Sequence, residues 1–378
     1  MAKSDKIYLD YNSTTPCDPD VIKALICAYK NVFANASSSH SLGKQAAQYA
    51  ETSRLKIAEL LGVESDEIYF TSGGTESNNM AIRGVAYGYS DRGSHIITTA
   101  IEHPSVLNTC EYLRSRGFKI THIPVDEWGL VDPLKVEAEI RPETILISVM
   151  YANNETGVIQ PVEKIARIAA TNDIVFHTDA VQALGKTPVR LGESKICSAS
   201  FSAHKIYGPR GLGCIYLRKG IRMENLMSGG SQEGGKRPGT INVPGIMGFA
   251  SALEKSVKLY QKEKIRIKKL AALLFKKLDL LNCKYYLNGH AEKRLENTLN
   301  ISFPELNASR LITDLDAEGI LVSAGAACRA GSNNGSHVLV AMGLSRERVN
   351  SAIRISLGRF TREQHITKFA ETLGKILK

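Results

Sequence analysis

Two residues of opposite charge follow strand-like segments and could serve one chemistry. Lys205 lies between the run "SFSAH" and the turn "YGPRGLG", with Ser202 and His204 as neighbouring donors, and Asp179 ends the run "DIVFHTD". Alone, Lys205 could be a surface turn residue and Asp179 a helix N-cap. Together, with Gln182 shortly after the aspartate, they suit pyridoxal 5'-phosphate. A lysine can form a Schiff base with its aldehyde, and a carboxylate can keep its ring nitrogen protonated.

A phosphate group needs a cradle, and the segment "YFTSGGTESNNMAI" at residues 69–82 has the required order of strand, glycine turn and helix. Gly73 and Gly74 free the backbone, and Thr75 opens the helix. The amides and the positive dipole end of such a helix favour an anion. The alternative is ordinary helix capping, by Thr75 with Asn78 or by Ser72 with Thr75.

Two further polar residues follow other strand-like runs. His103 stands before Pro104 in "TAIEHPSVL", where a histidine usually has a structural role, but it could also stack on a cofactor ring and handle protons. Asn154 lies in "MYANNETGVIQP" and could donate to a cofactor or to a substrate.

One cysteine stands in unusual surroundings. Cys328 lies in "SAGAACRAGSNNGSHVL", residues 323–339, where glycine, serine, alanine and asparagine predict a mobile loop rather than a packed core. The other six cysteines are far apart and read as small buried hydrophobic residues. Because there is no CxxC pair and no Cys/His set at zinc spacing, we expect no metal site and no disulfide scaffold.

The elements that position these residues alternate between short apolar runs and helical periods. The expected strands are residues 66–73, 95–100, 119–125, 144–151, 173–180 and 213–217. The expected helices between them are residues 75–89, 104–116 and 161–172. This alternation predicts an α/β protein with a mostly parallel sheet covered by helices.

A long helix at about residues 244–281 leads to a second region, which we expect to be a smaller α+β domain. Its expected strands are residues 297–303, 321–328 and 351–358, and its expected helices are residues 308–318, 336–343 and 361–377. We therefore divide the chain into an N-terminal segment 1–20 that packs with the small domain, a large domain 21–255 and a small C-terminal domain 256–378.

Composition narrows the class of protein. The 378 residues carry a formal net charge of +10, which would suit nucleic acid, an acidic protein or an anionic ligand. The densest basic run, residues 262–278, has apolar residues at helical spacing, so its lysines should cover the outer face of a helix. Because no aromatic residues interleave with them, we expect no direct nucleic-acid binding. The absence of a long apolar run and of a signal segment predicts no membrane contact and a cytoplasmic location.

Motifs in a fixed order resemble cysteine desulfurases of the NifS/IscS type, a branch of the class V aminotransferase superfamily. The resemblance covers nearly the whole chain and rests on "YLDYNSTTP", "FTSGGTESNN", "AIEHPSVL", "YANNETGVIQP", "HTDAVQALGK", "SFSAHKIYGPRGLG", "RPGTINVPGI", "SAGAACRAGS" and "AIRISLGRFT". It implies the transferase fold type I that binds pyridoxal phosphate, with a mainly parallel seven-stranded sheet between helices and a smaller C-terminal α+β domain.

The resemblance also assigns roles around the cofactor. Lys205 would hold it as a Schiff base, Asp179 would pair with the ring nitrogen, and Gln182 would pair with the ring hydroxyl. His103 would stack on the ring and shuttle protons. The phosphate would be held by Gly74, Thr75, Ser202 and His204, and by Thr240 of a neighbouring subunit, which implies a homodimer.

The substrate implied is L-cysteine. Asn154 would lie near its carboxylate and the ring hydroxyl, and Arg354 would clamp the carboxylate with two hydrogen bonds. The alternative for Arg354 is an ion pair at the edge of a strand. Cys328 would attack the substrate sulfur, release alanine, and carry a persulfide to a protein acceptor such as an iron–sulfur scaffold or a thiolation protein.

Three positions depart from the family pattern, namely Ala36, Arg329 and Gly235, and the departure in "CRAGSNNG" would affect loop mobility or the choice of acceptor. Two other readings stay open. The first is a related aminotransferase or selenocysteine lyase, although an aminotransferase has no use for Cys328. The second is an inactive relative that serves as a basic interaction protein.

Overall fold

The computed structural model describes residues 6–324 and 335–377. Its centre is a seven-stranded sheet with the strand order β2-β8-β7-β6-β5-β3-β4, in which only β8 runs antiparallel to its neighbours. In chain order the strands are Ile68–Thr71, His95–Thr99, Lys119–Ile123, Thr144–Ser148, Val175–Asp179, Ser198–Ser202 and Gly213–Leu217. Five of them are buried along their whole length, which explains their unbroken apolar or small-residue runs. The predicted mainly parallel seven-stranded sheet is confirmed.

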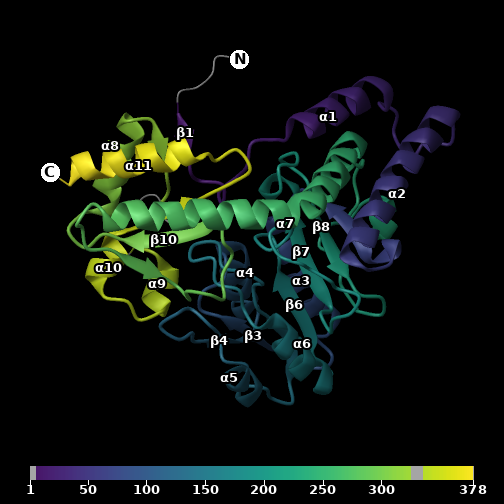
Figure 1. Cartoon of the computed structure of the whole chain (residues 1–378). Coiled ribbons are helices and arrows are strands. Elements are labelled where there is room, and N and C mark those ends of the chain that lie inside the picture. The colour runs from purple at the N-terminus through teal and green to yellow at the C-terminus, as the bar shows by residue number, and fades with distance from the viewer. Residues whose placement is uncertain (1–5, 325–334, 378) are drawn as a thin grey trace.

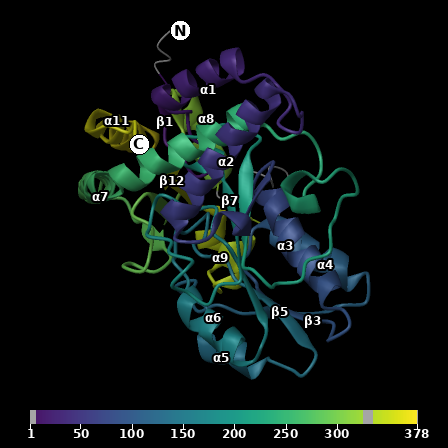
Figure 2. The same ribbon diagram turned by 90° about the vertical axis from the view of Figure 1, so that its right-hand side faces the viewer.

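Helices cover both faces of this sheet (Figure 2). On one face lie α3 (Gly74–Gly88) and α4 (Pro104–Arg114), whose apolar residues form a core with β3 and β5. On the other face lie α2 (Ser41–Leu61), α6 (Val162–Thr171) and the first half of α7. Two further helices, α1 (Pro19–Asn31) and α5 (Pro133–Ala138), complete this region. The sheet is therefore an inner layer, and its strand ends are the places where polar side chains can gather.

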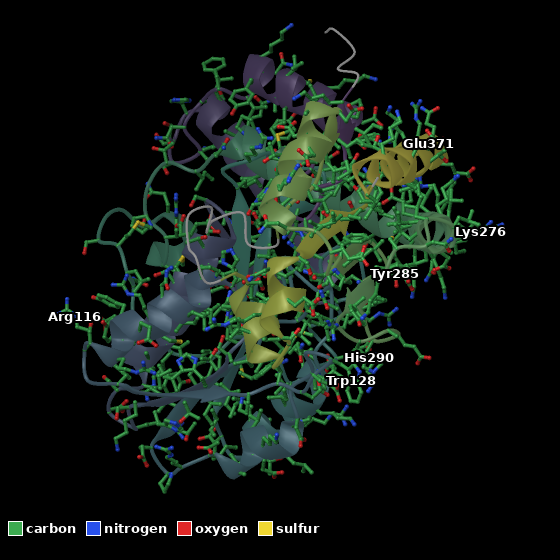
Figure 3. All side chains as sticks on the ribbon, turned by 90° about the vertical axis from the view of Figure 1, so that its left-hand side faces the viewer. Arg116, Trp128, Lys276, Tyr285, His290 and Glu371 are labelled. Atoms are coloured by element: carbon green, nitrogen blue, oxygen red, sulfur yellow. The ribbon has the colours of Figure 1, made fainter. Side chains whose placement is uncertain are left out.

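The long helix α7 (Val243–Asp279) runs across the molecule (Figure 1). Its first half packs in the core of the large sheet. In its second half Ile267, Leu270, Leu274 and Leu278 are buried in a different core, so the predicted amphipathic face is confirmed. The lysines lie on the other side, and Figure 3 shows Lys276 at the outer edge of the molecule.

The second core surrounds a three-stranded antiparallel sheet in the order β12-β10-β9. The strands are Ala352–Ser356, Thr298–Ser302 and Tyr286–Asn288. The helices beside them are α8 (Ala308–Ala317), α9 (His337–Ala341), α10 (Arg346–Asn350) and α11 (Glu363–Ile376). Near the N-terminus, β1 (Ile7–Tyr8) pairs in parallel with β11 (Ile320–Leu321). The division of the chain at residues 20 and 255 stays a prediction.

The strand expected at residues 321–328 differs from the observed one. β11 ends at Leu321, and Ser323 then forms an isolated bridge with Arg354 on β12. Residues 325–328 lie outside the described part of the chain. Within residues 6–324 and 335–377, no helix has the length and apolar character needed to span a bilayer.

Candidate active site

A cavity opens where β3, β5, β6 and β7 end, at the edge where open α/β sheets bind ligands. It encloses about 1020 Å³, part of which is open to solvent. Of the sequence-predicted site residues that the structure describes, all except Thr240 line it, namely Gly74, Thr75, His103, Asn154, Asp179, Gln182, Ser202, His204, Lys205 and Arg354. The structure therefore brings these ten side chains and backbone positions to one place.

Lys205 reaches the cavity from a turn of 3-10 helix, Ala203–Lys205, that directly follows β7. Its ammonium donates to the carbonyl oxygen of Asn12 at 2.5 Å and to that of Ser13 at 2.7 Å. The N-terminal segment thus fixes the position of the amine. A primary amine that is held by backbone oxygens at the carboxyl end of a strand is well placed to react with an aldehyde.

Asp179 ends β6 and uses its two carboxylate oxygens differently. Oδ1 accepts from the backbone N–H of Val181 at 3.0 Å, a cap-like bond, while Oδ2 accepts from Nδ2 of Asn78 at 2.7 Å. Oδ1 of Asn78 lies 3.2 Å from Nε2 of His177. Burial lowers the pKa of His177 to about 3, so the ring is neutral and its Nε2–H donates to Asn78. This chain of hydrogen bonds fixes the carboxylate of Asp179, which lines the cavity. The capping interpretation accounts for the bond of Oδ1 but not for that of Oδ2.

His103 caps a helix and also lines the cavity. It caps α4, because Nδ1 accepts from the backbone N–H of Ser105 at 3.2 Å. The neutral ring therefore carries its proton on Nε2. Burial lowers the pKa of His103, and the nearby carboxylate of Asp179 opposes that change. In this neutral form Nε2–H is a donor, while the lone pair of Nδ1 is already used by the cap.

The glycine turn forms the anion-binding end of the cavity. α3 begins at Gly74, and neither Ser72 nor Thr75 caps it with its side chain, so both capping alternatives are wrong. Among the described residues, side chains bind only the two amides before it, because Thr71 accepts from Gly73 N–H at 3.3 Å and Glu76 from Ser72 N–H at 2.7 Å. Gly73 has a φ of 152°, and a Cβ on Gly74 would lie 2.6 Å from Cγ2 of Val181. Ser202 and His204 line the same end, which continues into a space of about 670 Å³. Uncapped amides, a hydroxyl and an imidazole suit a phosphate.

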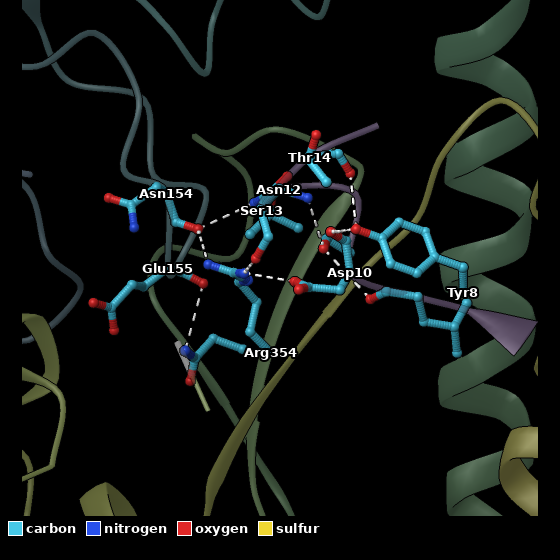
Figure 4. A network of polar contacts seen from close by, with 12 residues as sticks. Tyr8, Asp10, Asn12, Ser13, Thr14, Asn154, Glu155 and Arg354 are labelled. Atoms are coloured by element: carbon cyan, nitrogen blue, oxygen red, sulfur yellow. Dashed lines mark hydrogen bonds and ion pairs between the residues drawn. The ribbon is translucent and has the colours of Figure 1, made fainter. Parts of the chain in front are cut away.

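Arg354 comes from β12 and is 2% exposed. Its Nη2 donates to Asp10 at 2.6 Å and to the hydroxyl of Ser13 at 2.8 Å, and its Nη1 donates to the carbonyl oxygen of Asn154 at 3.1 Å (Figure 4). The ion-pair alternative therefore describes one of its contacts, because Asp10 is a partner. The guanidinium nevertheless lines the cavity, where a carboxylate of a ligand could meet it.

The donor set as a whole fits pyridoxal phosphate. An amine, a carboxylate and the start of α3 line one cavity. Gly74 leaves the room that a side chain would fill. These are the three requirements of a cofactor with an aldehyde, a basic ring nitrogen and a phosphate. Among the described residues no group of His, Cys, Asp or Glu is arranged to hold a metal ion.

Sequence reasoning missed several polar residues of the cavity. Asn12 and Ser13 reach it from the N-terminal segment, while Asn78 and Ser105 lie on the two helices beside the sheet. Asn12 also donates to Thr298 on β10 at 2.8 Å, so it connects the segment to the second core. The motif "YLDYNSTTP" contains the first two, but no local pattern connects it with this cavity.

One described residue of the predicted set lies elsewhere. Thr240 is exposed and lines no part of the cavity. Its loop is anchored through Glu233, whose carboxylate binds Arg54 at 2.7 Å and accepts from the backbone N–H of Phe70 at 2.7 Å. Cys328 lies outside the described residues.

Comparisons with known proteins place the chain. Residues 7–369 match the family model described as Aminotransferase class-V. The cysteine desulfurase IscS of Dictyoglomus turgidum is 43% identical over 99% of this chain and 95% of its own length. A solved structure of a NifS-like protein has a TM-score of 0.93 and 40% sequence identity, covering 98% of this chain and 99% of that one. Another, described as SspA in complex with cysteine, has a TM-score of 0.82 and 36% identity, covering 93% of this chain and 98% of that one. The chain therefore belongs to the class V aminotransferase family and, within it, to the pyridoxal-phosphate-dependent cysteine desulfurases of the NifS/IscS type.

Proposed function

We propose that the cavity between the strand ends and Arg354 is the active site of this cysteine desulfurase. The observation that carries the proposal is the arrangement of Lys205, Asp179 and the start of α3 around one space. Lys205 would hold the cofactor, Asp179 would pair with the ring nitrogen, and His103 would face the ring. The phosphate would lie against Gly74 and Thr75 with Ser202 and His204, and Gln182 would face the ring hydroxyl.

Bound pyridoxal phosphate supplies an aldehyde that links to amines and a ring that accepts electrons from the adjacent carbon of a substrate. The residues of this chain would do the rest. Arg354 and Asn154 would bind the carboxylate of L-cysteine, and Lys205 would remove the proton on its α carbon. His103, whose free Nε2 carries the proton of the neutral ring, would hold or return a proton beside it.

We assign the sulfur-accepting step to Cys328. The attacking thiolate forms a sulfur–sulfur bond as the carbon–sulfur bond of the substrate breaks. The bonding electrons stay with carbon, which takes up a proton and leaves as alanine, and Cys328 keeps the sulfur as a persulfide. The proton that the Cys328 thiol loses on forming the thiolate balances the proton that the carbon gains, so a thiol and L-cysteine become a persulfide and alanine.

Residues on both sides of the 325–334 segment support this assignment. Ser323 pairs with the backbone of Arg354, and Ser336 donates to the carboxylate of Glu155, next to Asn154. The ring of His337 lies 2.9 Å from the carbonyl oxygen of Glu102, next to His103. Both described ends of the segment that contains Cys328 are therefore attached to residues that line the cavity or adjoin its lining.

The assignment is tested with Cys328→Ser. The variant should keep the absorption of the bound cofactor but gain no sulfur from L-cysteine and release none. The matched control is Cys27→Ser, because Cys27 is a free, exposed cysteine on α1. Mass spectrometry of the wild type should find one added sulfur atom on the Cys328 peptide. Full turnover by Cys328→Ser, or a persulfide on another cysteine, would refute the assignment.

We further propose a homodimer in which Thr240 reaches the phosphate in the neighbouring subunit. Thr240 is exposed, and its loop is held in place by the buried pair of Glu233 and Arg54. A space of about 670 Å³ beside the start of α3 is open to an incoming residue. Exposed apolar side chains on and beside α1 also lack cover in one subunit, namely Ile22, Ile26, Tyr29 and Phe33. These features support a second copy as the missing partner.

The persulfide would pass to a protein acceptor, either an iron–sulfur scaffold or a thiolation protein, and we propose that this happens in the cytoplasm. All six cysteines of the described residues are free, as expected of a reducing compartment. Isotope-labelled persulfide, followed into the proteins of a cell extract, would identify the acceptor by mass spectrometry.

A further inference from the structure

We propose that Lys186 is a positioning residue that fixes the amide of Gln182 so that its N–H groups face the cofactor site. The inference deepens the proposed function and rests on it, because Gln182 matters only if a cofactor ring lies against it. Lys186 itself does not line the cavity of the candidate active site.

The geometry consists of a short chain of hydrogen bonds. Nζ of Lys186 donates to Oε1 of Gln182 at 2.7 Å, and Nε2 of Gln182 donates to the carbonyl oxygen of Asn12 at 3.0 Å. Gln182 is 5% exposed and lines the cavity. The carbonyl oxygen of Asn12 also accepts from Lys205 at 2.5 Å. Lys186 thus binds the oxygen end of the amide, while its nitrogen end shares the carbonyl oxygen of Asn12 with Lys205.

The hydrogen bond from Lys186 permits only one orientation of the Gln182 amide. An amide side chain can present either its oxygen or its N–H groups, whereas a lysine amine bound to Oε1 acts as a donor. Lys186 therefore requires the oxygen of Gln182 on its own side, and the N–H groups must turn toward Asn12 and the cavity. Without Lys186, Oε1 would be a buried acceptor that has lost its donor, and a flipped or displaced amide would remove that cost.

Lys186 lines a second cavity of about 570 Å³, which we call the rear cavity. Lys205 lines both the rear cavity and the active-site cavity. The titratable and charged lining of the rear cavity, apart from Lys186, consists of Tyr11, Lys205, Tyr207, Tyr260, Glu263, Lys264, Glu296 and Arg359. Glu263 is already paired with Arg359 at 2.5 Å. Burial lowers the pKa of Lys186 to about 7, and the charges of Lys205 and Arg354 add to that effect. The ammonium form can only donate and therefore fixes the orientation of Gln182, and the neutral amine can still donate to Oε1.

A hydrogen-bond donor that faces the ring oxygen stabilises the anionic form of that oxygen. Its loss should make the amine linkage to Lys205 more basic, and the loss of a nearby positive charge acts in the same direction. The pH midpoint of the absorption band of the Lys205-bound cofactor should therefore rise. One hydrogen bond to a charged group predicts a rise of about 1 pH unit.

The experiment titrates this band in wild type, Lys186→Met, Lys186→Arg and Lys264→Met. Lys264 is the matched control, because it lines the same rear cavity but has no hydrogen bond to Gln182. Lys186→Met should raise the midpoint by about 1 pH unit, Lys186→Arg should restore it, and Lys264→Met should leave it in place. An unchanged midpoint in Lys186→Met, or an equal rise in Lys264→Met, would overturn the inference.

A double-variant cycle separates positioning from a general effect of charge. In a Gln182→Leu background, Lys186→Met should add little further rise, because the amide that it positions is gone. If the full rise recurs in that background, Lys186 does not act through Gln182 and the inference is wrong. A wild type in which the band does not depend on Lys205 would instead refute the proposed function itself.

Discussion

Glu102, the residue before His103, should stay protonated at pH values at which a carboxyl group is normally ionised. It is fully buried, and burial raises its pKa from 4.5 to about 8. Oε1 accepts from the hydroxyl of Thr99 at 2.7 Å and from the backbone N–H of Met150 at 2.9 Å. In the described residues no partner faces Oε2. This asymmetry is what a neutral carboxylic acid needs, with a carbonyl oxygen that accepts and a hydroxyl that holds the proton.

The consequence is a pH-dependent cost to folding. Between pH 4.5 and about 8 the unfolded chain has lost the Glu102 proton and the folded chain keeps it, so the contribution of Glu102 to stability falls as pH rises through this window. Each pKa unit corresponds to about 1.4 kcal/mol, which gives a total of about 3–5 kcal/mol. Below pH 4.5 both states are protonated, and the cost disappears.

The test compares the free energy of unfolding of the cofactor-loaded wild type and of Glu102→Gln by urea denaturation from pH 5 to pH 9. The amide keeps an acceptor for Thr99 and Met150 but has no carboxyl proton to lose. Relative to wild type, the variant should therefore gain about 3–5 kcal/mol between pH 5 and pH 9. Any constant penalty for the new N–H groups cancels in this comparison. Parallel stability curves for the two proteins would refute the reasoning.

Two other predictions concern the phosphate end and the subunit contact. Gly74→Ala should weaken cofactor binding by about 1–3 kcal/mol, because its Cβ would lie 2.6 Å from Cγ2 of Val181. Adding Val181→Ala should restore much of the affinity, measured by titrating cofactor into apoenzyme; unaffected binding by Gly74→Ala would show that the glycine is not needed. If Thr240 serves the neighbouring subunit, mixing inactive Thr240→Ala and Lys205→Ala subunits should restore activity, since some mixed dimers then contain one intact site. Purified mixtures that stay as inactive as their components would contradict this arrangement.

The elements of the large sheet follow from local sequence because burial on both faces requires continuous apolar or small residues. The run at 173–180 is an example, with Val175–Asp179 buried throughout and its polar end at the ligand edge. The second half of α7 was equally readable, because Leu270 and Leu274 keep a helical period among lysines. Short β9, at Tyr286–Asn288, was not expected, since three residues give too little periodicity.

In the candidate site, some residues could be predicted from their place at the end of a strand, and others depend on contacts between segments far apart in the chain. Asp179 and His103 could be predicted as site residues because each follows a strand, and the parallel sheet brings these strand ends together. Asn12 could not be placed in this way, because its contact with Lys205 joins segments far apart in the chain. The hydrogen bond between Asn78 and Asp179 likewise depends on how α3 packs on the sheet. No local pattern of residues records a contact of that kind.

The central claim, that Lys205 is the residue that holds the cofactor, can be tested by a single chemical trap. Borohydride treatment of the loaded enzyme should fix the cofactor to one amine, and mass spectrometry of the digested chain should find it on the Lys205 peptide. Lys186 provides an internal comparison, because its amine also faces the rear cavity that Lys205 lines. Cofactor recovered on Lys186, or on any lysine other than Lys205, would contradict the account.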